Sequence, residues 1–386
     1  MDLLISRRSF LIGCSAAASP LITRIGFAAA PGENRLVVIV LRGAMDGLDV
    51  LRPVGDPAYA SLRPTLAEGE GGAPLDGFFA LHPAAAPLLP LWQTGELGFA
   101  HAVATPYRRR SHFTGQDFLE NGGGAADGAL TPGRDGWLNR AIGLIPGAGP
   151  RAGVTVGRER MLILEGAADT AHWMPVADPR LSAQGRLLLD ELHGADPLFA
   201  PVWTGAQALA TETAAGPNPK GDLAATDIGT HVAARLVADA RIATFSLGGW
   251  DMHQGQARLM ADRLAALAQT VLALRAGLGA HWGTTLVLAM TEFGRTAREN
   301  GSGGTDHGTG GAMLMAGGAL RGGRVLGRWP GLAEADLLNR RDLMPTADVR
   351  AHAAQALAGM FGLARGDLER VVFPGLDMGG AEPVLR

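Results

Sequence analysis

The sequence predicts a doubly wound α/β fold with a mostly parallel sheet, and two patterns carry this prediction. Residues Arg35–Leu41 (RLVVIVL) form an uninterrupted apolar, β-branched run, which is typical of a strand buried on both faces of a parallel sheet. Further along, the run Ile242–Leu247 is followed by apolar residues at helical spacing between Leu264 and Leu278, and then by a second strand-like run, Thr285–Met290. Strand, helix and strand in this order indicate a crossover between parallel strands.

The other expected elements are shorter. The segment 121–235 is rich in Gly, Pro and Ala and only weakly periodic, so we expect surface helices, loops and an insertion over the core there. Strands are predicted at Leu97–Ala102 and Ala312–Ala316, and helices at Leu88–Trp92, from Ser111 onward (SHFTGQDFLENGG) and at Asp348–Phe361.

Composition excludes several classes of protein. The chain has 386 residues, of which 47% are hydrophobic and 18% charged, so a disordered chain is ruled out. Its net charge of −3 gives no reason to expect nucleic acid or an anionic membrane surface as a partner. Single α/β domains reach this length, and we expect one domain over residues 31–386.

Residues 1–30 have the pattern of a twin-arginine signal peptide. Arg7 and Arg8 precede an apolar stretch that runs to Phe27, and three alanines follow as a cleavage site. This predicts export by the twin-arginine translocation machinery and a periplasmic or secreted protein. Pro20 and Arg24 interrupt the apolar stretch, so we expect no permanent membrane span.

The single cysteine, Cys14, lies within this leader in a Leu-Ile-Gly-Cys sequence. That sequence resembles a lipoprotein box, although it stands close to the arginines, so lipidation is left open. If cleavage follows Ala30, the mature protein contains no cysteine. Disulfides, thiolate metal ligands and a cysteine nucleophile are then excluded together.

Acidic and histidine side chains follow the predicted strands at the point where each strand ends. The carboxyl ends of parallel strands meet at one edge of a sheet, where open α/β folds bind their ligands. Carboxylates and imidazoles without thiolates suit Zn²⁺, Mn²⁺, Mg²⁺ or Ca²⁺. The predicted ligands of at least one divalent cation are Asp46, Asp251, His253, Glu292, Asp306 and His307.

Each of these residues also has a purely structural interpretation. Asp46 and Asp251 stand beside glycines and could cap turns. Glu292 could form an ion pair with Arg295, and His253 could be an ordinary loop histidine. The dense glycine setting of Asp306 and His307 (GTDHG) favours close approach to a ligand more strongly.

Ser111 is the candidate nucleophile. It follows three arginines and stands where a helix is expected to begin, so the helix N-terminus and the arginines would stabilise an anion there. No Gly-x-Ser-x-Gly motif surrounds it, which gives no support for an α/β-hydrolase. The alternative is an ordinary helix N-cap.

The order of these residues resembles the alkaline phosphatase-like superfamily, which includes phosphatases, cofactor-independent phosphoglycerate mutases and sulfatases. More closely, the motifs RGAMDGLDVLRP, SHFTGQDFLENG, GGWDMHQGQ, TEFGRT and GTDHGTGG look like the exported bacterial proteins of domain-of-unknown-function family 1501. The resemblance covers nearly the whole mature chain. It implies a three-layer α/β/α fold of the alkaline phosphatase-like type.

By position, the resemblance implies that Asp46 is the first metal ligand, that Ser111 is the nucleophile, and that Asp251 and His253 form a second ligand cluster. The Asp-x-His spacing here is shorter than in the phosphatases, and Glu292 with Phe293 stands where they have an Asp-His pair. At least one histidine of the full two-metal set is therefore missing. A single metal is as consistent with the sequence as two.

Two functions are consistent with these residues. The first is an exported, metal-dependent hydrolase of a phosphate or sulfate ester or a related small anionic substrate, with Ser111 attacking the ester. The alternative is a non-catalytic relative that keeps the fold as a binding or assembly protein of the cell envelope. The missing histidine favours the second, and the retained carboxylates with Asp306 and His307 favour the first.

Overall fold

Strand β1 (Arg35–Leu41) runs through the middle of the main sheet and all its residues are buried. It pairs in parallel with β8 (Ile242–Leu247) on one side and with β9 (Thr285–Met290) on the other. Leu36, Val38 and Val40 pack into one hydrophobic cluster, while the residues that alternate with them pack into a second. Both faces of β1 are thus covered, which explains its unbroken apolar sequence. The computed structural model describes residues 32–67, 72–124, 134–173, 191, 225–380 and 382–386.

The main sheet has the strand order β11-β5-β10-β9-β1-β8-β6-β7, with β12 also pairing with β5. Among the described strand pairs of this main sheet, only those of β10 with its neighbours β5 and β9 are antiparallel. A small second sheet has the order β2-β4-β3. The strands not yet bounded are β2 (Leu51–Arg52), β3 (Ala73–Pro74), β4 (Ala80–Leu81), β5 (Leu97–Ala104), β6 (Gly153–Val156), β7 (Ala171–Trp173), β10 (Gly311–Ala316), β11 (Val325–Leu326) and β12 (Ala347–Asp348).

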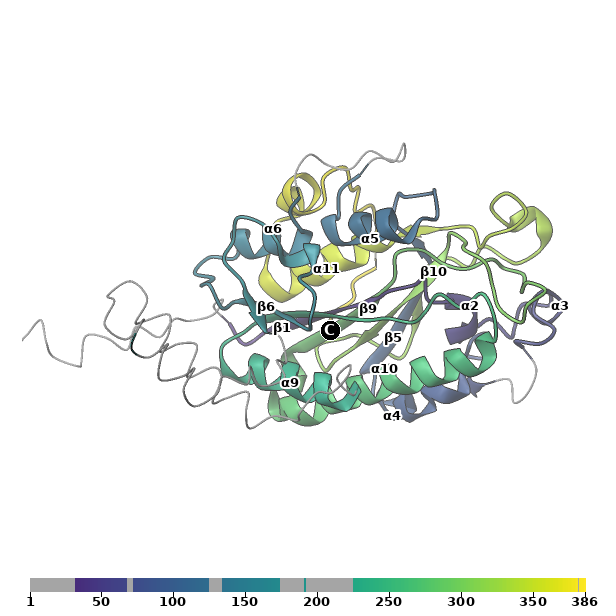
Figure 1. Ribbon diagram of the computed structural model, residues 1–386, viewed down its shortest axis with the longest axis horizontal. Coiled ribbons are helices and arrows are strands. Elements are labelled where there is room, and N and C mark those ends of the chain that lie inside the picture. The colour runs from purple at the N-terminus through teal and green to yellow at the C-terminus, as the bar shows by residue number, and fades with distance from the viewer. Residues whose placement is uncertain (1–31, 68–71, 125–133, 174–190, 192–224, 381) are drawn as a thin grey trace, which may run out of the picture.

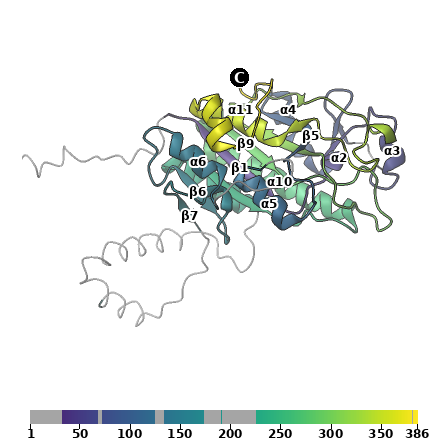
Figure 2. The same cartoon turned by 90° about the horizontal axis from the view of Figure 1, so that it is seen from above.

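Helices cover both faces of the main sheet, as Figure 1 shows. Helices α5 (His112–Asn121), α6 (Trp137–Leu144) and α11 (Val349–Phe361) lie on one face, and α4 (Leu89–Gln93), α9 (Ala225–Ala238) and α10 (Gln256–Leu278) lie on the other. Figure 2 shows the first of these layers from above. Shorter turns are α2 (Gly47–Val50), α3 (Tyr59–Leu62), α12 (Arg365–Asp367), the 3₁₀ segments Pro83–Leu88, Leu162–Leu164, Gly279–Thr284 and Glu334–Asp336, and a π-helical turn (Leu368–Val372).

The predicted three-layer α/β/α class with a mostly parallel sheet is confirmed. The crossover from β8 through α10 to β9 is present, and β1 lies between the two strands that it connects. Leu264, Leu267 and Leu274 of α10 are buried against the sheet, as their helical spacing predicts.

The prediction for the segment 121–235 needs a correction in the part that is described. Strands β6 and β7 belong to the main sheet, and α6 packs against the core next to it. These strands have four and three residues, which is too short for a recognisable alternation in the sequence. Residues 174–190 and 192–224 lie outside the described residues, as does the predicted signal peptide.

Among the helices of the described ranges, none combines the length and the hydropathy that crossing a bilayer requires.

Candidate metal centre

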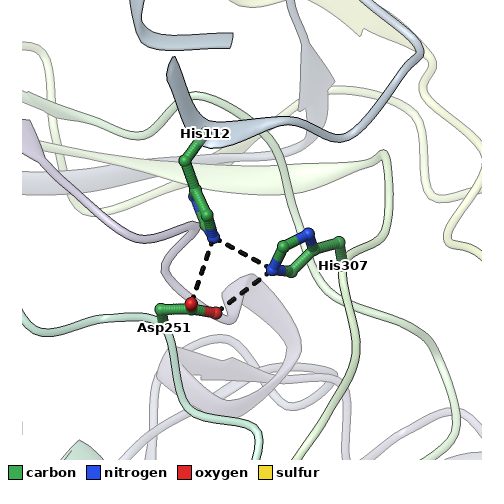
Figure 3. Close-up of side chains that lie close together, drawn as sticks. All are labelled: His112, Asp251 and His307. Carbon is green, nitrogen blue, oxygen red and sulfur yellow. Dashed lines mark hydrogen bonds and ion pairs between the residues drawn. The ribbon is translucent and has the colours of Figure 1, made fainter. Parts of the chain in front are cut away.

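Four side chains meet at the carboxyl edge of the sheet. His112 is the first residue of α5, which follows β5. Asp251 and His253 lie in the loop between β8 and α10, and His307 lies in the loop that leads into β10. Figure 3 shows His112, Asp251 and His307 pointing toward one another from three separate segments.

His307 is the centre of this cluster. Its Nε2 atom lies 2.9 Å from Nε2 of His112, 3.0 Å from Nε2 of His253 and 3.2 Å from Oδ1 of Asp251. Asp251 also approaches the other two imidazoles, with Oδ2 at 3.3 Å from Nε2 of His112 and Oδ1 at 3.0 Å from Nε2 of His253. Ligand atoms of His112, Asp251 and His307 all lie within 4.8 Å of one another, as a metal ion requires.

The hydrogen-bond partner of Nδ1 decides which of the two nitrogens of each imidazole carries the proton. In all three rings Nδ1 faces an oxygen that can only accept a hydrogen bond, so Nδ1 is the protonated nitrogen and Nε2 of the neutral ring carries a lone pair. The three Nδ1 pairs are His112 with Oε1 of Glu292 at 2.8 Å, His253 with Oδ1 of Asp306 at 3.2 Å, and His307 with the carbonyl oxygen of Arg110 at 2.9 Å.

Both carboxylates in these pairs are ionised near neutral pH. Burial raises the pKa of Glu292, but hydrogen bonds from His112, Gln116 and the N–H of Gly43 outweigh it and lower the pKa overall. A hydrogen bond from Asn300 is the main cause of the lowered pKa of Asp306. Both groups therefore accept from the imidazoles rather than donate to them.

Three lone pairs and a carboxylate consequently point at one another with no proton between them when the rings are neutral. Such an arrangement is repulsive in the absence of a cation. Oriented imidazoles, each held by an acceptor on its outer nitrogen, are the usual surroundings of a protein-bound transition metal. The set of His112, Asp251, His253 and His307 can hold one divalent cation.

Arg295 removes part of the negative charge. Its guanidinium is fully buried, and Nη2 donates to Oδ1 of Asp251 at 2.6 Å. Burial alone would raise the pKa of Asp251, but the hydrogen bond and charge of Arg295 bring it to about 2. Arg295 thus forms an ion pair at this edge of the sheet, but with Asp251 and not with Glu292, the partner considered in the sequence analysis. It leaves the three imidazole lone pairs without a cation.

The imidazoles differ in their affinity for protons. The hydrogen bond to Glu292 is the largest influence on His112 and raises its pKa. Burial is the largest influence on His307 and lowers its pKa. His112 therefore keeps a proton more readily than His307 when no metal is bound, and metal binding would displace that proton.

Two glycines bring the loops together. Gly43 has φ +118°, and a Cβ there would lie 2.5 Å from the backbone nitrogen of Asp251. A Cβ on Gly304 would lie 2.5 Å from the carbonyl oxygen of Met252. Side chains at these positions would push the loop of Asp251 away from its neighbours, which explains the glycines of the RGAMDG and GTDHG motifs.

The structure brings only part of the ligand set predicted from the sequence into one cluster. Asp251, His253 and His307 lie together, but Glu292 and Asp306 use the oxygens that face the cluster to accept from His112 and His253. Glu292 is fully buried and also accepts from the N–H of Gly43. Both carboxylates therefore accept from an imidazole of the cluster.

Asp46 does not join the cluster. Its carboxylate accepts from Nη1 and Nη2 of Arg63 at 2.6 and 3.0 Å, and also from the side chain of Gln256 at 2.7 Å. It caps α2 as well, through the N–H of Leu48. These bonds occupy both oxygens, so Asp46 has the structural role that was the alternative for it.

Ser111 stands at the N-cap position of α5, directly before His112. Its side chain makes no capping bond, and no hydrogen bond joins its hydroxyl to any residue in the described ranges. The residue is exposed, and its N–H donates to the hydroxyl of Tyr107 at 3.1 Å. The capping interpretation is therefore not supported, and the hydroxyl is left available at a helix N-terminus.

Sequence reasoning missed His112. Its motif, SHFTG, drew attention to the serine, and a histidine at the start of a helix has no spacing signal of its own. The missing imidazole of the phosphatase-like set was the available hint. His112 provides an imidazole from a different segment, since α5 starts at the same edge of the sheet as the loops after β8 and β9.

Fold and site define an α/β protein with a candidate metal centre at the carboxyl edge of a mostly parallel sheet. The family model described as "Protein of unknown function (DUF1501)" matches residues 83–372, so the chain belongs to this family. The family expected from the sequence motifs is confirmed. No curated protein sequence matches the chain.

Several solved structures are similar to it. Ps i-CgsB in complex with k-i-k-neocarrahexaose has a TM-score of 0.42 at 11% identity, over 87% of this chain and 74% of that one. A protein in the alkaline phosphatase superfamily from Vibrio parahaemolyticus has a TM-score of 0.40 at 13% identity, over 97% of this chain and 80% of that one. The C-terminal periplasmic domain of EcEptC from Escherichia coli, in complex with Zn, has a TM-score of 0.34 at 11% identity, over 75% and 76%. At these sequence identities and TM-scores, the activities of these proteins are not assigned to this chain.

Proposed function

We propose that the chain is an exported, metal-dependent hydrolase of a phosphate or sulfate ester, built around one divalent cation. His112, Asp251, His253 and His307 bind the cation. The observation that carries this proposal is the convergence of three imidazole Nε2 atoms and one carboxylate within 2.9–3.3 Å of their neighbours. Each ring is held by an acceptor at Nδ1, so its lone pair faces inward.

The donor set favours zinc over the hard cations. Three imidazoles and one carboxylate suit Zn²⁺ or Mn²⁺, whereas Mg²⁺ and Ca²⁺ prefer oxygen ligands. The side chains of His112 and His307 are 21% and 25% exposed, so solvent and substrate can reach the cluster. Four protein ligands complete a tetrahedral zinc site, so an ester oxygen would enter as a fifth ligand, which catalytic zinc can accept.

A bound divalent cation supplies Lewis-acid polarisation of the ester oxygens. Ser111 is the proposed nucleophile, because its hydroxyl makes no capping bond and it precedes His112 in the chain. Its Oγ forms a bond to phosphorus or sulfur, the bond to the ester oxygen breaks, the serine proton passes to solvent and the leaving alkoxide takes a proton from solvent. A water molecule then attacks the phosphorus or sulfur of the seryl ester and loses a proton to solvent. The bond to Oγ breaks, Oγ takes up a proton, and phosphate or sulfate leaves. The uncapped N-terminus of α5 favours the negative charge of the substrate.

Activity of the zinc-loaded protein toward para-nitrophenyl phosphate and para-nitrophenyl sulfate tests this proposal. We expect hydrolysis of one of them that a chelator abolishes and added zinc restores. Ser111→Ala should lower kcat by at least ~10³-fold, while Ser302→Ala, an exposed loop serine, should leave it unchanged. Zinc binding without hydrolysis of either ester would favour the non-catalytic cell-envelope protein. An unchanged Ser111→Ala variant would remove Ser111 as the nucleophile.

The export part of the proposal rests on Arg7 and Arg8 and on the alanines that precede Pro31. Changing both arginines to lysine should leave the precursor in the cytoplasm. Mature protein in the periplasm of cells that make this variant would contradict export by the twin-arginine translocation machinery.

A further inference from the structure

A groove of about 620 Å³ adjoins the metal centre. Asp306, whose carboxylate holds Nδ1 of His253, forms part of its wall. Arg341 forms another part, and its Nη1 donates to the carbonyl oxygen of His307 at 2.8 Å. The groove therefore begins at a residue that contacts the imidazole of His253 and at one that contacts the backbone of His307. Its volume is within the range of sites for small organic molecules.

The groove has an apolar side. Leu62 of α3 lines it together with Leu332 and Leu337, and these side chains belong to one small hydrophobic cluster. Ser61 lines the groove from the exposed side of the same helix. An inorganic anion would gain nothing from this surface, whereas an organic group could bury apolar area there.

Arg298 is an arginine of the groove that has no counter-ion among the residues that the structure describes. Arg341 pairs with Asp342 at 2.8 Å, and Arg340 lies 3.6 Å from Glu334. Glu299 accepts from the backbone N–H groups of Thr65 and Leu66 instead of pairing with a cation. Among the residues that the structure describes, none pairs with the guanidinium of Arg298, which is exposed in the groove.

We propose, building on the proposed function, that this groove binds the alcohol part of the ester, and that this part is an organic group with an apolar face and a second anionic group. The phosphate or sulfate lies at the metal centre, the apolar face lies on Leu62, Leu332 and Leu337, and the second anion meets Arg298. The substrate class is thus an organic phosphate or sulfate ester that carries a second anionic group, rather than a simple alkyl phosphate or sulfate.

A second cavity, among the residues that the structure describes, does not compete for this role. It has a volume of about 740 Å³ and is lined by Trp92, Gln93 and Gly322 among others. It shares no residue with the metal centre or with the residues that hold its imidazoles. A ligand there would not present an ester to the cluster.

Binding of three non-hydrolysable phosphonates to the zinc-loaded protein, measured by calorimetry, tests the inference. The probes are methylphosphonate, benzylphosphonate and 4-carboxybenzylphosphonate. We expect the benzyl group to tighten binding about tenfold through apolar burial. The carboxylate should add a further factor of about two to five, because Arg298 is exposed and its ion pair is screened.

Two variants separate the parts of the groove. Ser61→Trp should fill the groove and lower the affinity of both benzyl probes to that of methylphosphonate. The control is Ala60→Trp, at an exposed position of the same helix outside the groove, which should leave all three affinities unchanged. Arg298→Ala should abolish only the preference for the carboxylated probe. The matched change Arg321→Ala, at an exposed arginine outside the groove, should preserve it.

The outcomes distinguish this inference from the proposed function. If methylphosphonate does not bind to the zinc-loaded protein, the hydrolase proposal fails. If methylphosphonate binds and the benzyl probes bind no more tightly, the groove is not a substrate site and the inference is overturned. Equal effects of Ser61→Trp and Ala60→Trp would overturn it as well.

Discussion

Two groups of acidic side chains lie at the carboxyl edge of the sheet, and they are built in opposite ways. The first is the buried frame, which we define as Asp46, Asp49, Arg52, Arg63 and Gln256; all five are between 0% and 5% exposed. The second is the candidate metal centre around Asp251, whose side chain is 44% exposed. The sequence assigned Asp46 and Asp251 to the same site, but only one of them is free for a ligand.

In the buried frame each carboxylate has its own arginine. Arg63 binds Asp46 through two nitrogens, and Arg52 binds Asp49 at 2.9 Å. The amide of Gln256 donates to Asp46 at 2.7 Å and to Asp49 at 3.0 Å. The charges are thus balanced without any ion from solution, as burial requires.

At the metal centre only one arginine of the described residues, Arg295, meets the cluster, and three imidazole lone pairs have no partner of opposite charge. Acidic residues at a sheet edge therefore do not by themselves mark a metal site. What marks it is a set of donors that the protein orients but does not neutralise.

The largest effect is expected from breaking the frame. Arg63→Met should leave Asp46 buried without its cation and lower the free energy of unfolding by about 3–5 kcal/mol. Urea denaturation of the metal-free protein measures this, with the exposed Arg321→Met as the control. A loss below about 1 kcal/mol would show that the frame is not the rigid support described here.

Removing a proposed metal ligand should lower zinc affinity and leave the free energy of unfolding of the metal-free protein nearly unchanged. His307→Ala removes the ring that contacts all three other donors, so zinc affinity should fall by more than the ~10–100-fold typical of outer partners. Stability of the metal-free protein should change little, since repulsive donors are removed. Calorimetric zinc titration and urea denaturation test both halves, with the exposed His281→Ala as the control. Unchanged zinc affinity in His307→Ala would exclude this residue as a ligand.

Residues that orient the imidazoles should matter less than the imidazoles. Glu292→Gln weakens the acceptor for Nδ1 of His112, and zinc affinity should fall by ~10–100-fold. Asp306→Asn should have a smaller effect, because Asp306 and His253 are more exposed and the distance between them is longer. If Glu292→Gln abolished zinc binding while His112→Ala did not, Glu292 itself would be the ligand.

The smallest effect concerns pH. Glu292 raises the pKa of His112 above its usual value of 6.5, so this ring takes up a proton as the pH is lowered through neutrality, and zinc affinity should fall. Asp251, with a pKa of about 2, stays ionised in this range and contributes nothing to the change. Zinc titrations at pH 8, 7 and 6 should show the fall, and Glu292→Gln should shift it to lower pH. Affinity that rises in acid would contradict the assignment of His112.

The sequence predicted the long strands and the crossover because their residues are buried on both faces and have a recognisable pattern. Strand β1 coincides with its predicted range, and β8 and β9 do as well. The short strands β6 and β7 could not be recognised, since four and three residues show no period.

The sequence predicted the edge of the sheet at which Asp251, His253 and His307 meet, but it could not predict the contacts of each residue. Glu292 and His112 are 180 positions apart, so no local pattern reveals that one holds the other. Asp46 resembles a ligand by its place after β1, and only Arg63, at 0% exposure beside it, shows that its charge is already balanced. Roles of this kind depend on contacts between distant segments.

The most direct test of the metal centre is anomalous diffraction at the zinc edge from crystals of the mature protein grown with Zn²⁺. We predict one strong peak about 2 Å from Nε2 of His112, His253 and His307 and from an oxygen of Asp251, and no zinc on Asp46. A peak on Glu292 or Asp46, or no peak among the three imidazoles at saturating zinc, would contradict this assignment.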